Sequence, residues 1–248
     1  MRVAALCDIH ANLPALEAVL ADVEQEDVDV IVCGGDMISG PLPRETFDVL
    51  LGLGERTRFV LGNADRWFLD VYDGLTEPEP ADAWLIDQID ESERGFFAAL
   101  PRHVVVDVDG LGDVLFCHGS PRSEDEIITA ITSKSRLEPM LEGIHERVVV
   151  CGHTHVQFDR TVAGKRVVNA GSVGMPYEDA PGARWGLLDE EIELRRTEYN
   201  RETAAERLRE SGWGRRDEFI EKYLLAPPSA KVATEHFERM ALELERGA

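Results

Sequence analysis

Five short polar clusters in the sequence combine aspartate, histidine and asparagine with glycine. They are Asp8-Ile9-His10, Gly34-Gly35-Asp36, Gly62-Asn63-Ala64-Asp65, His118-Gly119 and Gly152-His153-Thr154-His155. As candidate ligands they offer two aspartates, four histidines and one asparagine. A mixture of carboxylate oxygen and imidazole nitrogen suits Mn, Fe, Zn, Co or Ni far better than Ca. Seven ligands would crowd one ion, whereas two ions that share a carboxylate can clamp the attacking and leaving oxygens of a phosphoryl displacement.

Each cluster follows a short apolar run of the kind that forms a buried strand. We expect the early strands at residues 3–7, 28–33, 58–61, 104–108, 114–117 and 148–151. Apolar residues at helical spacing follow Asn12-Leu13-Pro14, with the proline tolerated in the first turn, so the chain opens as a parallel βαβ unit. The carboxyl ends of neighbouring parallel strands meet at one edge of a sheet, so the five clusters should converge in one crevice.

Three further segments of the chain have sequence patterns of their own. Strands at 157–162, 166–169, 184–188 and 192–197 are closely spaced, which predicts a second, mostly antiparallel sheet. Residues 66–100 read as a helical insertion that begins at the crevice edge and should affect substrate choice. Its aromatic side chains, Trp67 and Phe68 among them, favour core packing over stacking on a substrate base. From residue 201 we expect helices that break at Pro227-Pro228, the last with Phe237, Met240 and Leu244 on one face.

The five clusters, taken in order, resemble the signature of the calcineurin-like metallophosphoesterases, which runs D-x-H, G-D, G-N, H and G-H-x-H. The resemblance covers roughly residues 1–190, and the glycine-rich stretch 169–174 is similar to small bacterial and archaeal phosphodiesterases. It implies an α/β fold, a four-layer α/β/β/α sandwich with two mixed sheets. Residues 1–200 would form the metallophosphoesterase domain, and 201–248 a C-terminal helical extension that packs on the same domain.

The resemblance also implies a set of site residues and two divalent metal ions, with manganese preferred and Fe, Zn, Co or Ni as alternatives. One ion would be held by Asp8, His10, Asp36 and His155, and the other by Asp36, Asn63, His118 and His153. Asp36 would be the bridge, and Asp36, Asn63 and His118 the catalytic residues. Substrate binding is expected from Asn12, Arg66 and Arg122, although surface ion pairs explain the two arginines equally well.

The implied activity is that of a binuclear phosphodiesterase, in which a metal-bridging hydroxide attacks a small or nucleotide-type phosphoester in line. A phosphomonoesterase, a dinucleoside polyphosphate hydrolase and a non-catalytic protein-binding scaffold stay open as alternatives. Many family members have a histidine at the position of Ala64 that assists the leaving group. In the wider family the residue at Asp65 orients that histidine, so Ala64→His is expected to restore a positioned acid.

Other histidines and the cysteines are expected to be structural. His103, His145 and His236 lie outside the clusters, and we expect them to be hydrogen-bonded core residues. The four cysteines, at 7, 33, 117 and 151, end apolar runs and should pack in the core as free thiols.

The composition and net charge of the chain limit which molecules it can bind. The chain has 248 residues, 44% of them hydrophobic, which is enough for one large α/β domain. A formal net charge of -22 repels a nucleic-acid backbone and an anionic membrane, so we expect a small phosphoester substrate, no nucleic-acid duplex and no membrane. Residues 3–6 are too short an apolar run for a signal peptide, which predicts a cytoplasmic protein and leaves homo-oligomerisation open.

Overall fold

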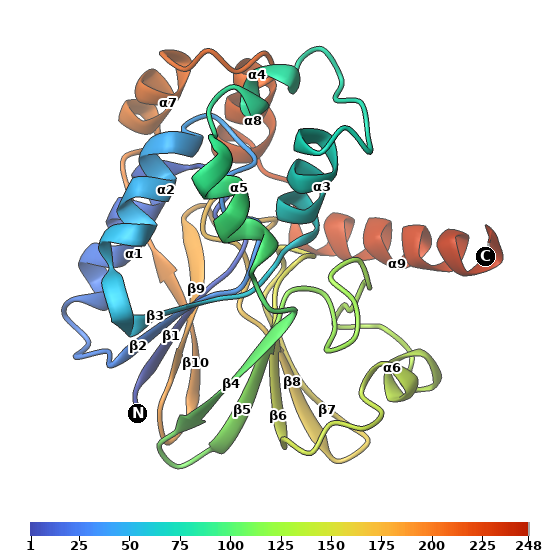
Figure 1. Cartoon of the computed structure of the whole chain (residues 1–248). Coiled ribbons are helices and arrows are strands. Elements are labelled where there is room, and N and C mark those ends of the chain that lie inside the picture. Colours follow the sequence, from blue (N-terminus) through green and yellow to red (C-terminus); the bar gives the residue numbers. More distant parts are fainter. Residues whose placement is uncertain (248) are drawn as a thin grey trace.

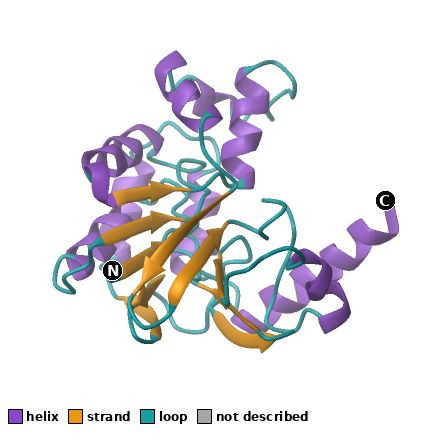
Figure 2. Cartoon of the chain, turned by 60° about the horizontal axis from the view of Figure 1, so that its bottom comes forward, coloured by secondary structure: helices purple, strands orange, loops and turns teal. Residues whose placement is uncertain are grey.

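The computed structural model describes residues 1–247 and contains two five-stranded sheets with helices on their outer sides (Figures 1 and 2). The strand order is β10-β9-β1-β2-β3 in the first sheet and β4-β5-β6-β8-β7 in the second. Both sheets mix parallel and antiparallel pairs. The predicted α/β sandwich with two mixed sheets is therefore confirmed.

The first sheet is built around the parallel strands that open the chain. They are β1 (Val3–Leu6), β2 (Val30–Cys33) and β3 (Thr57–Phe59), with α1 (Leu13–Val23), α2 (Pro43–Gly52) and the short 3₁₀ helix η1 (Gly54–Arg56) in the connections. Strand β9 (Ala183–Leu188) pairs antiparallel with β1, and β10 (Ile192–Thr197) pairs antiparallel with β9. All four residues of β1 are buried, because one face packs on helices and the other on the second sheet.

The second sheet has a parallel centre and antiparallel edges. Its strands are β4 (His103–Val108), β5 (Gly112–Cys117), β6 (Val148–Cys151), β7 (Phe158–Val162) and β8 (Lys165–Asn169), with α6 (Lys134–Met140) on its outer side. Strands β5, β6 and β8 run parallel, whereas β4 and β7 are antiparallel to their neighbours. The predicted separate antiparallel sheet after residue 157 is thus wrong. The β7-β8 hairpin extends the sheet that contains β6, whereas β9 and β10 join the sheet that contains β1. Long-range burial, and not the spacing of strands in the sequence, decides which sheet a hairpin joins.

Side chains from both sheets form the layer between them. Val3 and Val32 of the first sheet and Phe116 and Val150 of the second belong to one buried apolar cluster. Each fully buried side chain of this size contributes about 1.5–3 kcal/mol. This layer fixes the two sheets face to face, with the carboxyl ends of their parallel strands on the same side.

Helices fill the segments that the sequence marks as helical. Between β3 and β4 lie α3 (Asn63–Tyr72), α4 (Ala83–Ile86) and α5 (Glu91–Ala98). After β10 come α7 (Arg201–Arg209), α8 (Arg216–Phe219), the π-helix η2 (Ile220–Leu225) and α9 (Ala230–Gly247), with Pro227-Pro228 before the last. Phe68 and Phe97 are buried in the same core as Phe219 and Leu208, so the aromatic side chains of the insertion pack as core residues. Helix α9 reaches outward beside the strand ends (Figure 1).

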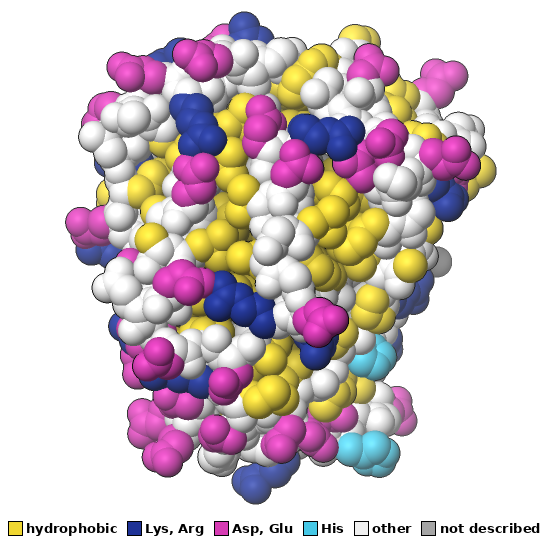
Figure 3. Space-filling model, turned by 60° about the vertical axis from the view of Figure 1, so that its left-hand side comes forward, with side chains coloured by type: hydrophobic (Ala, Val, Ile, Leu, Met, Phe, Trp, Pro, Cys, Tyr) yellow, Lys and Arg dark blue, Asp and Glu magenta, His cyan; other side chains and the backbone are white. Residues whose placement is uncertain are grey.

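The surface is acidic, and the thiols are internal. Acidic side chains outnumber basic ones on the face in Figure 3, in keeping with the net charge of -22. All four cysteines are buried and free, as predicted. His103, His145 and His236 are exposed, so their predicted place in the core is wrong.

No helix among the described residues is both long and apolar enough to span a membrane.

Candidate metal centre

The five polar clusters meet at the carboxyl ends of strands from both sheets. Asp8, Asp36 and Asn63 follow β1, β2 and β3, whereas His118 and the His153/His155 pair follow β5 and β6. The single parallel sheet expected to gather the clusters is therefore replaced by two facing sheets. Their strand ends point to the side of the molecule that carries α3 and α9 (Figure 1).

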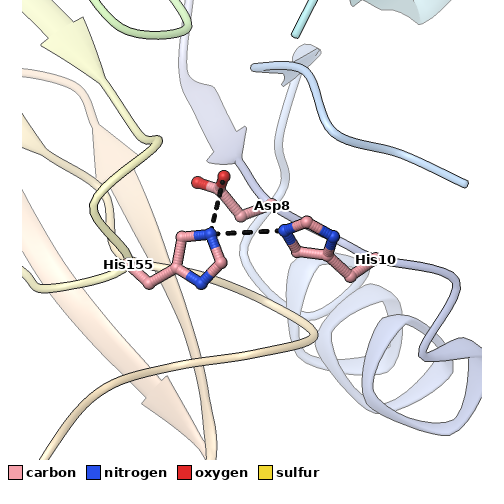
Figure 4. Close-up of side chains that lie close together, drawn as sticks. All are labelled: Asp8, His10 and His155. Atoms are coloured by element: carbon pink, nitrogen blue, oxygen red, sulfur yellow. Dashed lines mark hydrogen bonds and ion pairs between the residues drawn. The ribbon is translucent and has the colours of Figure 1, made fainter. Parts of the chain in front are cut away.

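The first group of ligand atoms comes from Asp8, His10 and His155 (Figure 4). His155 Nε2 lies 3.2 Å from Asp8 Oδ1 and 3.2 Å from His10 Nε2. Asp36 Oδ2 is 3.7 Å from His10 Nε2, so a second carboxylate faces the same group. All four side chains are buried. This arrangement matches the four residues expected around the first ion.

The second group comes from Asp8, Asp36 and His118. His118 Nε2 is 3.5 Å from Asp36 Oδ1, 3.9 Å from Asp8 Oδ1 and 2.9 Å from Asn63 Oδ1. Asp36 presents one oxygen to each group, as a bridging ligand would. Asp8 also belongs to both groups, which the expected ligand set does not include.

His153 lies beside these groups and does not join either. Its ring centroid is 5.1 Å from that of His118, and its backbone N–H donates to Asp8 Oδ2 at 2.9 Å. The structure therefore brings six of the seven predicted ligands together around the two groups and places His153 next to them.

The histidine rings are oriented by backbone carbonyls. The Nδ1 atoms of His10, His118 and His155 lie 3.2, 2.8 and 2.7 Å from the carbonyl oxygens of Ser39, Gly34 and Met175. A carbonyl only accepts, so each Nδ1 carries the donated hydrogen and each Nε2 turns toward the centre. In neutral His10 and His155, two nitrogen lone pairs then face each other at 3.2 Å.

These contacts fit a bound cation. Two facing lone pairs repel each other unless a positive charge lies against both of them. In addition, Asp8 Oδ1 is buried and has no hydrogen-bond partner. Buried acceptors without a partner cost free energy in the metal-free protein, and a divalent ion would bind their lone pairs. Carboxylate and imidazole donors together suit a transition-metal ion.

The backbone of the ligand loops is strained. Five of the eight non-glycine residues with positive φ in the described chain are predicted ligands: Asp8, His10, Asp36, His153 and His155. Positive φ costs free energy in non-glycine residues, so such outliers concentrate at functional sites. Glycine is required next to them, because a Cβ at Gly62 would overlap the Asp36 carboxylate and one at Gly152 would overlap that of Asp8.

Asp65 holds the Asp36 loop in place. It is fully buried, and its carboxylate accepts the backbone N–H groups of Asp36, Met37 and Gly62 at 2.8, 3.0 and 3.0 Å. Both oxygens are thus occupied by the backbone. Three of the roughly four acceptor positions of this carboxylate are thus taken, which leaves it little capacity to orient a histidine at position 64. Instead, Ala64 donates its own N–H to Asp36 Oδ1 at 2.8 Å.

The charges of the groups depend strongly on one another. Burial lowers the pKa of His118, but the carboxylates of Asp36 and Asp8 outweigh it and raise that pKa to about 10. Burial raises the pKa of Asp36, but the neighbouring His118 and His10 hold it well below its usual range. Burial and His118 lower the pKa of His153 to about 4. At neutral pH, His118 therefore serves as the internal cation that a divalent ion would replace.

The three residues expected to bind substrate have other partners. Asn12 is fully buried, accepts from Ala15 N at 3.4 Å to cap α1 and donates to the carbonyl oxygen of Gly174 at 2.8 Å. The side-chain amide is thus used inside the protein, and its role in substrate binding stays a prediction that these contacts disfavour. Arg66 pairs with Glu124 at 2.6 Å and Asp125 at 2.7 Å, and Arg122 pairs with Glu126 at 2.5 Å. These contacts favour the ion-pair interpretation of both arginines.

The sequence did not predict the aromatic residues that lie beside the site. The Tyr177 ring stacks on His155, with centroids 4.8 Å apart. Tyr223 of η2 and Phe237 of α9 lie 5.9 and 6.2 Å from Tyr177, and Phe237 is 6.3 Å from His153. The apolar face predicted for the last helix included Phe237, but its contact with the site could not be read from periodicity.

A family model for the calcineurin-like phosphoesterase superfamily domain matches residues 1–191. The chain belongs to this superfamily. The match spans all five polar clusters and confirms the resemblance inferred from them. The protein is a metallophosphoesterase with a buried Asp/His cluster that can hold metal.

Relatives of this metallophosphoesterase include proteins with and without a described activity. The uncharacterized protein MJ0912 of Methanocaldococcus jannaschii is 26% identical over 231 residues, which cover 83% of this chain and 91% of the relative. A solved metallophosphoesterase from Sphaerobacter thermophilus is 26% identical with a TM-score of 0.73, covering 91% of this chain and 99% of that one.

A third relative has a named substrate class. The symmetrical bis(5'-nucleosyl)-tetraphosphatase of Yersinia pestis (strain Pestoides F) is 31% identical over 138 residues. The aligned part covers 54% of this chain and 47% of that enzyme, so it spans about half of the relative.

Proposed function

We propose that this metallophosphoesterase is a binuclear phosphodiesterase that acts on small or nucleotide-type diesters. The observation that carries the proposal is the pair of buried ligand groups, which share Asp8, with Asp36 a member of the second group and also facing His10 of the first. Asp8, His10, Asp36 and His155 would hold one ion, and Asp36, Asn63 and His118 the other, with His153 beside it. When bound, two cations would polarise the phosphoryl oxygens and lower the pKa of a water molecule that attacks phosphorus.

The residues of the chain have separate tasks in this proposal. Asp36 presents its two oxygens to the two groups and so sets their spacing. The carbonyls of Ser39, Gly34 and Met175 fix the imidazole rings, and Asp65 fixes the Asp36 loop. Asn63, with its side-chain oxygen 2.9 Å from His118 Nε2, would be a ligand of the ion that His118 binds.

The charges around the site support a diester over a monoester. A monoester carries one more negative charge than a diester at neutral pH, and a binding site must balance it. The two arginines closest in sequence to the ligands, Arg66 and Arg122, are already paired with acidic side chains. The positive charge of the site would therefore come chiefly from the ions, which favours a substrate with a single charge on the reacting phosphate.

Dinucleoside polyphosphate hydrolysis is the second candidate. It is favoured by the 31% identity with the Yersinia tetraphosphatase over the half of that enzyme that aligns. Such a substrate is more highly charged than a simple diester, so it needs cationic groups beyond the two ions.

A substrate panel assayed after removal of metal tests the proposal. The chelated protein is supplied with Mn, Ni, Co or Zn and assayed with bis(p-nitrophenyl) phosphate, p-nitrophenyl phosphate, cyclic nucleotides and diadenosine tetraphosphate. We expect metal-dependent hydrolysis that is fastest for the diester. Faster hydrolysis of the monoester or of the tetraphosphate would replace the proposal by one of the alternatives, and full activity with chelator would reject the two-metal site.

A further inference from the structure

A cavity of about 210 Å³ opens directly beside the metal centre. His10 belongs both to the lining of this cavity and to the first ligand group. Ser39 and Met175, whose carbonyls hold the rings of His10 and His155, also line the cavity, so it adjoins the first ligand group through His10 and these two loops. The cavity is smaller than the about 300–1,000 Å³ typical of sites for drug-sized ligands, so it suits a single ring system.

The walls of the cavity are aromatic. Trp213 and Phe219 are buried, with ring centroids 5.8 Å apart, and Tyr223 lies 6.0 Å from Phe219. Met175, whose carbonyl orients His155, completes the apolar lining. The planes of these neighbouring rings are inclined by 64° and 67°, and Tyr223, which is half-buried while the other two are buried, is the ring against which a flat ligand can stack. The wall thus predicts a planar substituent.

The polar groups of the cavity are mainly hydrogen-bond acceptors. Asp82 and Glu218 each contribute a carboxylate, and Arg215 contributes the one guanidinium in the lining. Arg215 is already paired with Asp82 at 3.1 Å and with Glu79, and Trp213 Nε1 donates to Asp82 at 3.1 Å. Glu218 in turn pairs with Lys222 at 2.7 Å, so the three carboxylates of Asp82, Glu218 and Glu79 outnumber the two cations Arg215 and Lys222 by one, which disfavours a second phosphate and favours N–H donors.

The aromatic wall lies outside the segment that the superfamily shares. The family match ends at residue 191, whereas Trp213, Phe219 and Tyr223 belong to the C-terminal segment. The insertion between β3 and β4, which we expected to govern substrate choice, contributes Asp82 to this lining, while Phe68 is buried in the core. The metal ligands and the aromatic wall thus belong to different parts of the chain.

We infer that this cavity binds a planar heteroaromatic group with exocyclic N–H donors, as in an amino-substituted nucleobase, that forms the non-reacting substituent of the diester. The inference rests on the proposed function and adds a substrate class to it. The ring packs against Tyr223, its amine donates to Asp82 or Glu218, and the phosphate remains at the ligand groups beside His10.

Matched esters with one leaving group test the inference. The probes are methyl p-nitrophenyl phosphate and the 5'-(p-nitrophenyl) phosphates of adenosine and of purine riboside, which lacks the amine. We expect kcat/KM to be highest for the adenosine ester. Tyr223→Leu should lower the adenosine-to-methyl ratio about tenfold through lost stacking. Asp82→Asn should lower the adenosine-to-purine ratio, because it removes the charged acceptor.

Control variants come from similar side chains elsewhere in the chain. Tyr72→Leu removes a half-buried tyrosine of α3, and Asp73→Asn removes an aspartate that pairs with Arg94. Neither control should change either ratio. Equal kcat/KM for the three esters in the native chain, or a uniform fall for all esters in both cavity variants, would overturn the inference.

Binding of adenosine to the chelated protein separates this inference from the proposed function. Calorimetric titration should give saturable one-to-one binding that Tyr223→Leu weakens about tenfold and Tyr72→Leu leaves unchanged. Failure of hydrolysis with every metal, together with this binding, would reject the diesterase and retain the cavity. Absence of saturable adenosine binding to the correctly folded native chain would reject the cavity whatever the activity.

Discussion

Tyr177 stacks on His155, with ring centroids 4.8 Å apart and an interplanar angle of 20°. The same histidine is fixed through Nδ1 by the carbonyl oxygen of Met175, two residues before Tyr177. The loop after β8 thus holds His155 both by a hydrogen bond and by an aromatic contact. Its orientation toward Asp8 depends on this loop.

Tyr177→Leu should weaken metal binding at the group of Asp8, His10 and His155. An aromatic pair contributes about 0.5–1.5 kcal/mol, so the Kd for Mn should rise about two- to tenfold. Calorimetric titration of the chelated protein measures this. Tyr177→Phe keeps the ring and should bind as the native chain does, and equal affinity in Tyr177→Leu would show that the hydrogen bond to Met175 suffices.

Asp36→Asn should remove activity and lower the number of metal ions bound per chain. Asparagine can present only one oxygen, while Asp36 faces His10 with one oxygen and His118 with the other. Metal analysis after gel filtration and assay with bis(p-nitrophenyl) phosphate measure both effects. Asp48→Asn, on an exposed position of α2, is the matched control. Two ions bound by Asp36→Asn would contradict the bridging role.

Metal binding should release a proton near neutral pH. His118 in the metal-free protein has a pKa of about 10 and is therefore protonated at pH 7. A metal ion needs the neutral imidazole, so apparent affinity should increase as pH rises, by up to about tenfold per unit for one released proton. Titrations at pH 7 in buffers with different ionisation enthalpies measure the proton. Uptake of a proton, or no exchange, would contradict the release of a proton from His118 on metal binding.

The rate should depend steeply on the leaving group, because Ala64 offers no acid. A positioned acid contributes about 10²- to 10⁴-fold, with the greatest effect on poor leaving groups. Log kcat/KM for aryl diesters should thus fall sharply as leaving-group pKa rises. Ala64→His should keep this slope, because three backbone N–H groups already bind the Asp65 carboxylate and leave it little capacity to orient the new ring. A shallower slope in the variant would show that the ring finds another partner.

The residue types of the site could be predicted from the sequence because they follow strands. Asp8 and His118 each come directly after a buried run, and that position alone brings them to the end of a sheet. The pairing of the late hairpins could not be predicted in the same way. Strand β9 pairs with β1, which lies about 180 residues away in the sequence. Long-range burial decides this pairing, and the alternation of apolar and polar residues within a strand does not indicate which strand it pairs with.

The sequence also could not show which role a residue has when its position is compatible with two. Asn12 follows the first cluster closely, but its buried amide caps α1 and bonds the Gly174 carbonyl. Tyr177 and Tyr223 carry no motif, and only the fold brings them to His155. The spacing of residues in the sequence indicates the structure of one helix or strand at a time, whereas these roles depend on contacts between segments far apart in the chain.

The origin of the ligands on two sheets has a mechanical consequence. Asp8 and Asp36 are carried by one sheet and His118 and His155 by the other, so ions held between them would act as cross-links across the sandwich. Sliding of the sheets past each other would then require the ligands to release the ions. The free energy of unfolding should rise with the free metal concentration by RT ln(1 + [M]/Kd) for each site, and the melting temperature with it, so that metal supply would set the stability of the fold as well as its activity.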